Sequence, residues 1–225
     1  MADPTEPPPE PSIGLNDAYA VETPDDNVAL YRRWASSYES DFMAETGYLY
    51  HERVADYFEQ VAERGDGPVL DAGCGTGVVG VAVSARGGWA IDGIDISPDM
   101  LARAAEKRNA AGEPLFGSLH QADLTEPLPI PDDTYGSVVS AGVFTTGHVG
   151  PRAVNELVRV VRPGGPLVLG VNSRFYAASG FAQHLEEMVG FELVEIIGVE
   201  VVPIYDGDTH EHSDDTAHLV ALRAR

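Results

Sequence analysis

The chain has one cysteine, Cys74, and one lysine, Lys107, among its 225 residues. A single cysteine excludes an internal disulfide bond and a cysteine-based zinc site. No apolar run approaches the ~20 residues that a membrane-spanning helix needs. No basic segment precedes an apolar one near the N-terminus, as a secretory signal requires. We therefore expect a cytoplasmic protein that does not bind membranes.

Basic side chains are scarce throughout the chain. It carries 14 Lys and Arg against 36 Asp and Glu, a formal net charge of −22. Such a surface repels nucleic-acid phosphates and anionic lipid headgroups. Hydrophobic residues make up 44% of the chain, which is enough for a real core. The composition leaves a small molecule as the expected partner, and it is compatible with either a monomer or a homodimer.

The residue pattern predicts a short N-terminal segment followed by one domain. Residues 1–24 are rich in proline and acids and are expected to be disordered. Residues 25–225 are predicted to form the domain. Its first part, 25–64, is expected to be a helical cap with helices over 25–40 and 48–64, because apolar residues recur there at helical spacing.

Beyond this cap, strands and helices are predicted to alternate. Four helices are expected between the first five strands or directly after them, at 77–85, 97–110, 152–161 and 175–189. Two late strands follow each other without a helix and are expected to pair as an antiparallel hairpin. The predicted fold class is α/β: a Rossmann-like, seven-stranded, mostly parallel sheet with helices on both faces and an antiparallel C-terminal hairpin. The strands are expected at 69–71, 89–94, 118–121, 135–140, 167–171, 191–197 and 217–223.

The most informative stretch is Val-Leu-Asp-Ala-Gly-Cys-Gly-Thr-Gly at 69–77. Gly73, Gly75 and Gly77 have no Cβ, so the backbone can turn sharply and approach a ligand closely. Asp71 is expected to place a negative charge at the mouth of this turn. A carboxylate there would repel a pyrophosphate and attract a sulfonium. The stretch predicts a site for a cationic, nucleotide-like cofactor, for which S-adenosylmethionine is the candidate.

The same stretch leaves two other functions open. Residues 75–80 match the dinucleotide pattern G-x-G-x-x-G, and Asp95 lies near the expected downstream distance. An NAD(P)-dependent oxidoreductase is therefore an alternative, although Asp71 and the additional Gly73 favour a methyl donor. A protein that binds S-adenosylmethionine without catalysis is a further alternative.

Acidic residues recur at the carboxyl ends of the next strands, where open α/β sheets bind ligands. Asp95 could accept hydrogen bonds from ribose hydroxyls, and Ile96 could pack on adenine. Asp123 could accept from the adenine amino group beside Leu124, and residues 141–143 would border the methyl group. Each acid alone could be a helix cap or a turn residue. Three of them at successive strand ends are much less expected by chance.

With these motifs the chain resembles the class I S-adenosylmethionine-dependent methyltransferases. The motifs at 69–77, 93–100, 121–124 and 159–165 occur in that family's order. The resemblance implies the seven-stranded sheet and cofactor contacts at the glycine turn and the strand ends. Tyr31-x-x-Trp34-Ala-x-x-Tyr38 and residues 144–148 are similar to the methyltransferase-like proteins of the Williams-Beuren region group. The fourth strand lacks the Asn-Pro-Pro-Tyr segment that accompanies nucleic-acid methylation in the family, which favours a small-molecule acceptor.

These observations predict in-line methyl displacement, in which alignment matters more than acid–base chemistry. His148 is the candidate base for an acceptor that must lose a proton, although it could merely hydrogen-bond backbone. His210 and His212 resemble metal ligands by type, but a solvated loop is the expected state, and no metal site is predicted. The predicted cofactor-binding residues are Tyr38, Asp71, Gly73, Cys74, Gly75, Gly77, Asp95, Ile96, Met100, Asp123, Leu124, Ala141 and Val143.

Overall fold

A computed structural model describes residues 17, 18, 20, 21, 23–35, 38–43, 46–63, 65–207 and 210–225. Most of the predicted disordered segment, 1–24, lies outside the described residues, so its disorder stays a prediction. The boundary between that segment and the predicted domain likewise stays a prediction.

Seven strands form one sheet in the order β3-β2-β1-β4-β5-β7-β6. The first five are mutually parallel, whereas β7 runs antiparallel to both β5 and β6. The predicted fold class is therefore confirmed, including the C-terminal hairpin. The strands are β1 (Val69–Ala72), β2 (Ile91–Asp95), β3 (Phe116–Gln121), β4 (Ser137–Phe144), β5 (Pro166–Asn172), β6 (Val194–Pro203) and β7 (Thr216–Ala224).

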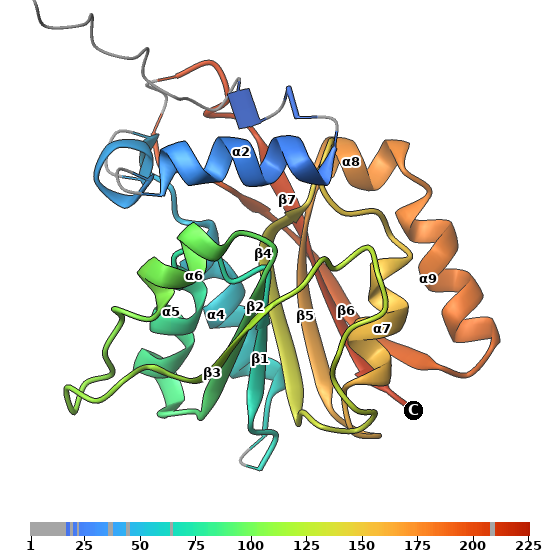
Figure 1. Cartoon of the computed structure of the whole chain (residues 1–225). Coiled ribbons are helices and arrows are strands. Elements are labelled where there is room, and N and C mark those ends of the chain that lie inside the picture. The colour runs from blue at the N-terminus through green and yellow to red at the C-terminus, as the bar shows by residue number, and fades with distance from the viewer. Residues whose placement is uncertain are drawn as a thin grey trace, which may run out of the picture.

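Helices cover both faces of the sheet (Figure 1). One face carries α4 (Tyr50–Val61), α5 (Val78–Gly87) and α6 (Pro98–Ala104), and the other carries α7 (Ala153–Arg159) and α9 (Phe181–Gly190). Helix α4 thus packs on the sheet and is not part of a cap. The elements that lie across the upper edge of the sheet in Figure 1 are α2 (Pro24–Trp34) and α8 (Ser173–Ala178).

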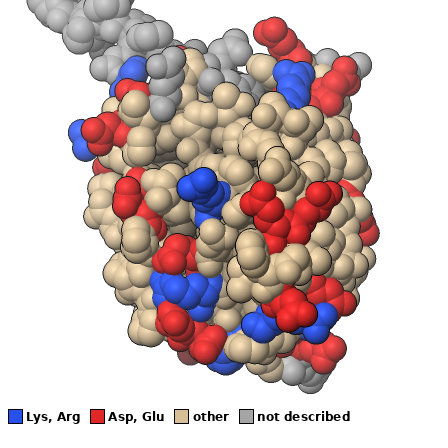
Figure 2. Space-filling model, turned by 90° about the vertical axis from the view of Figure 1, so that its right-hand side faces the viewer, with Lys and Arg blue, Asp and Glu red and all other residues tan. Residues whose placement is uncertain are grey.

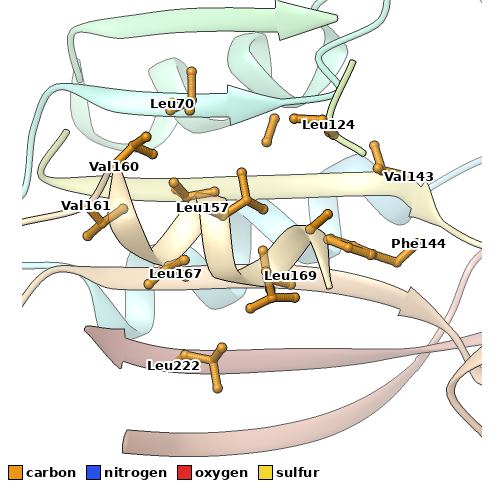
Figure 3. Close-up of a cluster of buried hydrophobic side chains, with 14 of the residues drawn as sticks. Leu70, Leu124, Val143, Phe144, Leu157, Val160, Val161, Leu167, Leu169 and Leu222 are labelled. Atoms are coloured by element: carbon orange, nitrogen blue, oxygen red, sulfur yellow. The ribbon is translucent and has the colours of Figure 1, made fainter. Parts of the chain in front are cut away.

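The core beneath α7 fixes the parallel strands (Figure 3). Leu157 of α7 packs in one cluster with Leu70 of β1 and with Leu167 and Leu169 of β5, and all four are 0% exposed. Burying a leucine side chain contributes about 1.5–3 kcal/mol. Strands β1 and β5 are therefore packed against the same helix.

The predicted helix over 25–40 is wrong in its second half. Helix α2 ends at Trp34, and a separate π-helix, η1, spans Tyr38–Met43. The start was predictable, because Thr23 and Asp26 form a capping box. The spacing of four misled because the Trp34 and Tyr38 rings still pack edge to face, with centroids 5.1 Å apart.

Three other predicted boundaries are wrong for local reasons. The helix expected over 97–110 ends at Ala104, and the Asn109 side chain instead accepts two backbone hydrogen bonds in a turn. The helix expected over 175–189 is divided by Gly180, whose φ is +75°. Strand β4 continues to Phe144, so residues 141–143 lie within the strand and not after it.

Within the described part of the chain, every helix is too short or too polar to cross a bilayer. On the face seen in Figure 2, acidic and basic side chains lie next to one another, with uncharged surface between them. That face presents no continuous basic strip of the kind that tracks a phosphate backbone.

Candidate functional site

A cavity of about 130 Å³ lies at the carboxyl ends of β1, β2 and β4, beneath α2. Its wall includes every predicted site residue except Asp71 and Gly77. The predicted residues that line it are Tyr38, Gly73, Cys74, Gly75, Asp95, Ile96, Met100, Asp123, Leu124, Ala141, Val143 and His148.

The glycine turn requires glycine for two different physical reasons. Gly73, at φ +71°, approaches β4 so closely that a Cβ would lie 2.1 Å from a methyl carbon of Val143. Gly75, at φ +52°, would place a Cβ in open space, so its requirement comes from the left-handed backbone. Gly77 is the N-terminal cap of α5 at φ +90°, with the Phe116 ring beside it, and it is not part of the cavity wall.

The structure corrects the expected position of Asp71. Its side chain is 0% exposed, and one oxygen accepts a hydrogen bond from the Gly80 amide of α5 at 3.0 Å. Side chains alternate along β1, so Asp71 shares with Val69 the face covered by α4 and α5, not the mouth of the turn. Burial raises the pKa of Asp71 to about 7. Asp71 therefore supports the glycine turn from behind.

Asp95, at the end of β2, also supports the glycine turn, and it lines the cavity. Its two oxygens accept from the amides of Gly75 and Ser97, each at 2.8 Å. Burial raises the pKa of the Asp95 carboxyl, while the backbone donors of Ser97 and Gly75 partly oppose the shift. Each carboxylate oxygen can accept a further bond, so ribose hydroxyls remain compatible with this position.

The amides of the G-x-G-x-x-G match are already engaged within the chain. The Gly75 amide donates to Asp95, and the Gly80 amide donates to Asp71. The Gly77 amide donates to the carbonyl of Cys74 at 2.8 Å. A dinucleotide pyrophosphate needs such amides, and it would also meet the Asp95 carboxylate on the cavity wall. The local geometry thus disfavours the NAD(P) alternative.

The far end of the cavity suits a flat, apolar ring with a polar edge. Met100 and Leu124 are 3% and 5% exposed and lie on the wall with Ile96. Asp123 accepts from the Thr125 amide at 2.8 Å and from its hydroxyl at 2.7 Å, which fixes the carboxylate. Cys74 is buried, and burial raises the pKa of its thiol, as expected of a spacer rather than a nucleophile.

Two residues with buried polar atoms, which sequence reasoning missed, also line this cavity. Asn27 and Thr76 are 7% and 2% exposed and line the wall, yet Asn27 Oδ1 and Thr76 Oγ1 have no hydrogen-bond partner among the described residues. Buried polar atoms normally find a partner. Their positions therefore fit a polar ligand. Asn27 could have been found from its spacing, since it precedes Tyr31 by one turn of α2.

His148 also lies on the cavity wall and is held as a neutral imidazole. Its Nδ1 lies 3.2 Å from the carbonyl of Thr146, which only accepts, so Nδ1 carries the proton. Nε2 then accepts from the Tyr31 hydroxyl at 3.1 Å. Burial lowers the pKa of His148 below its usual range. The arrangement presents a neutral nitrogen base bonded to a tyrosine hydroxyl.

A second cavity of about 70 Å³ adjoins the first. The two have five wall residues in common, so they meet at a shared boundary. Trp34 is 2% exposed and lines only the second cavity. The shared residues are Tyr31, Tyr38, Tyr48, Gly142 and His148.

The histidines near the last strand have structural partners. His210 Nε2 lies 3.3 Å from the carbonyl of Thr46, and His212 Nδ1 lies 3.3 Å from a carboxylate oxygen of Asp215. Among the described residues, no group of three or more histidine, cysteine or acidic side chains is placed to hold a metal ion.

The site defines a class of protein once it is compared with known ones. Residues 69–165 match the model of a methyltransferase domain family. Human methyltransferase-like protein 27 is 32% identical over 72% of this chain and 64% of its own length. A phosphatidylethanolamine N-methyltransferase from Cereibacter sphaeroides is 37% identical over 62% of this chain and 64% of its own length.

A solved structure agrees at the level of the fold. The crystal structure of a TehB-like methyltransferase from Corynebacterium glutamicum aligns with a TM-score of 0.57 at 19% identity, covering 90% of this chain and 100% of that one. Over residues 69–165 the chain matches a methyltransferase domain, and its fold is that of S-adenosylmethionine-dependent methyltransferases, whose cofactor is S-adenosylmethionine. It spans less than two thirds of the length of either relative.

Proposed function

We propose that this protein transfers a methyl group from S-adenosylmethionine to a small-molecule acceptor by in-line displacement. When bound, the cofactor supplies a methyl group already activated on a sulfonium. The observation that carries the proposal is the junction of the two cavities at Tyr31, Gly142 and His148. One cavity is lined by residues that we expect to bind the cofactor, and the other would give an acceptor separate space beside them.

The chain's own residues supply binding and alignment. We assign the ribose hydroxyls to Asp95, the adenine amino group to Asp123 and the faces of the adenine ring to Ile96 and Leu124. Strand β4 would border the methyl group through Ala141 and Val143, at the cavity junction. Asp71 acts indirectly, because it holds the first turn of α5 against the glycine turn.

We assign His148 as the general base for an acceptor that must lose a proton. The residue lines both cavities, and with the proton on Nδ1 its Nε2 accepts from the Tyr31 hydroxyl. The proton of an acceptor would therefore pass to Nε2 directly or through that hydroxyl. A neutral imidazole near pH 7 is required for this, and burial favours the neutral form.

The name of one relative and the net charge of the chain limit which acceptors and which cellular location we propose. The Cereibacter sphaeroides relative is named as an N-methyltransferase, so we include nitrogen, with oxygen and sulfur, among the proposed acceptor atoms. The net charge of −22 opposes a nucleic-acid substrate and an anionic membrane surface. We propose a cytoplasmic protein that acts as a monomer or a homodimer.

Calorimetric titration with S-adenosylhomocysteine tests cofactor binding. Formation of S-adenosylhomocysteine from S-adenosylmethionine in the presence of panels of acceptors tests catalysis. We expect saturable binding of S-adenosylhomocysteine and no heat from NAD or NADP. Product formed with any small acceptor supports the enzyme. Binding without product across amine, hydroxyl and thiol panels would instead favour a cofactor-binding protein that does not catalyse.

A further inference from the structure

The second cavity, which we term the aromatic chamber, is walled largely by rings. Four of the rings, Trp34, Tyr50, Phe144 and Tyr205, line only this cavity. Tyr31 and His148 also line the first cavity, which we term the cofactor cavity. We propose that the aromatic chamber binds an amine carried on a small apolar body, so that the transferred methyl group goes to nitrogen. This inference rests on the proposed methyl transfer and names the acceptor class for that same site.

Charge is the first reason. Among the described residues that line the aromatic chamber, none carries a Lys, Arg, Asp or Glu side chain. A carboxylate or phosphate on the acceptor would be desolvated there without a cation to pair with it. An ammonium loses less, because aromatic faces attract a cation by about 0.5–2 kcal/mol or more where water is excluded.

The rigidity of the wall is the second reason. Tyr31 and Trp34 stack with centroids 6.0 Å apart, and Tyr48 meets Tyr205 edge to face at 5.9 Å. Trp34, Tyr50 and Tyr205 are 2%, 2% and 5% exposed. Rings packed against one another are oriented before a ligand arrives, so the chamber need not be ordered by its ligand.

The charge of the whole chain acts in the same direction. With 36 acids against 14 bases, the protein field concentrates cations near its surface and disfavours anions. An amine that is protonated in solution would therefore be steered toward the molecule. Once inside, it meets rings and hydroxyl or amide dipoles, so no buried carboxylate has to be neutralised first.

Methyl transfer to an amine also matches how charge moves in the reaction. The nitrogen lone pair forms the new N–C bond while the C–S bond breaks, and the bonding pair stays on sulfur as a neutral thioether. The positive charge thus passes from sulfur to nitrogen, and the product is a methylammonium ion in the chamber. Nitrogen must be unprotonated to attack, so an ammonium first loses its proton to solvent or to His148 Nε2.

Binding of a matched pair of probes tests the inference without turnover. Protein saturated with S-adenosylhomocysteine is titrated with choline and with 3,3-dimethylbutan-1-ol, which has the same shape but no charge. We expect choline to bind more than about ten-fold more tightly, the factor that 1.4 kcal/mol of cation–aromatic attraction gives. Equal affinities, tighter binding of the alcohol or no binding of choline would overturn the amine assignment.

A pair of variants at Tyr205 locates the effect. Tyr205 lines the aromatic chamber and not the cofactor cavity. Tyr205→Phe keeps the ring and should change choline affinity by less than about two-fold, whereas Tyr205→Leu removes it and should weaken binding by about ten-fold. S-adenosylhomocysteine affinity should be unchanged in both and reports that each variant is folded. Equal choline affinities in the two variants would contradict the ring's role.

Turnover completes the test. We expect benzylamine to be methylated and benzyl alcohol not, with a rate that rises with pH as the neutral amine accumulates. Methylation of the alcohol in preference to the amine would overturn the amine assignment while supporting methyl transfer itself. Failure to bind S-adenosylhomocysteine at all would instead remove the proposed function, so the two failures are distinguishable.

Discussion

The cofactor cavity and the aromatic chamber are adjacent but built on different principles. The cofactor cavity is made by the ends of β1 and β2, where backbone amides and carboxylates bond within a stretch from Asp71 to Ser97. The aromatic chamber gathers rings from α2 at Trp34 to the segment after β6 at Tyr205. The first depends on hydrogen bonds of fixed geometry, and the second depends on burial and ring packing between distant segments.

The largest expected effect concerns the buried acid behind the glycine turn. The pKa of Asp71 is raised from 3.8 to about 7 in the folded protein. Between these values the folded state holds a proton that the unfolded state lacks, so the free energy of unfolding falls as pH rises. The full fall is about 4 kcal/mol, at ~1.4 kcal/mol per pH unit.

Asp71→Asn removes this titration, so its stability relative to the wild type should rise by up to that amount from about pH 4.5 to pH 8. Urea unfolding of both proteins across this range measures the difference. Asp99→Asn, at an acid whose side chain is 42% exposed, is the control. Parallel stability profiles for wild type and Asp71→Asn would show that the buried acid does not titrate in this range.

Asp95→Ala should cost the most cofactor affinity. It removes both bonds that hold the amides of Gly75 and Ser97, together with the proposed ribose contact. Loss of charge-assisted hydrogen bonds of this kind corresponds to about 3 kcal/mol, or roughly 100-fold in the dissociation constant of S-adenosylhomocysteine. Calorimetry measures it, with Asp99→Ala as the control. An affinity within a factor of three of wild type would refute the assignment.

Gly147→Ala tests whether the contact of Gly147 with Val21 and α2 stabilises the protein separately from the strand-end carboxylates. Gly147 has φ +78°, and a Cβ there would lie 1.9 Å from the carbonyl oxygen of Val21. Its own carbonyl accepts from Asn27 Nδ2 at 3.2 Å. We expect about 1–3 kcal/mol lower stability and faster amide exchange in α2.

Cofactor affinity of Gly147→Ala should fall by only about ten-fold, because the strand-end carboxylates remain in place. Hydrogen exchange and calorimetry check the two effects. Gly150→Ala is the matched control, since a Cβ at Gly150 meets nothing within 4 Å. Unchanged exchange in α2 would contradict this role of the Gly147 contact.

The smallest effect is expected at the chain's lysine. Lys107 Nζ contacts both carboxylate oxygens of Glu39 in η1, at 2.7 and 2.6 Å, with side-chain exposures of 22% and 40%. Partly exposed pairs contribute about 0–1 kcal/mol. Lys107→Met should therefore weaken S-adenosylhomocysteine binding by no more than about five-fold, less so at high salt. Arg103→Met is the control, and an equal effect there would deny Lys107 a specific role.

The grouping of the predicted residues around one cavity could be read from the sequence because their motifs are local. Glycines that need left-handed backbone, and acids that end successive strands, leave a readable spacing in one stretch of chain. The same spacing misplaced Asp71, because the direction of its side chain depends on which face of β1 the helix α5 covers. Thr76 was missed, since an isolated polar residue in a loop has no pattern of its own, whereas Asn27 had a usable signal in its spacing of one helical turn from Tyr31.

The sequence by itself determined the alternation of strands and helices, the reversed C-terminal hairpin and the glycine turn after β1, because each follows from short-range periodicity, turn geometry and charge. Only the tertiary structure decided that Asp71 is buried behind that turn, that His148 accepts from Tyr31 and that rings from four separate segments enclose a second cavity. Those features arise from packing between residues far apart in the chain, where no local spacing sets which side chains meet.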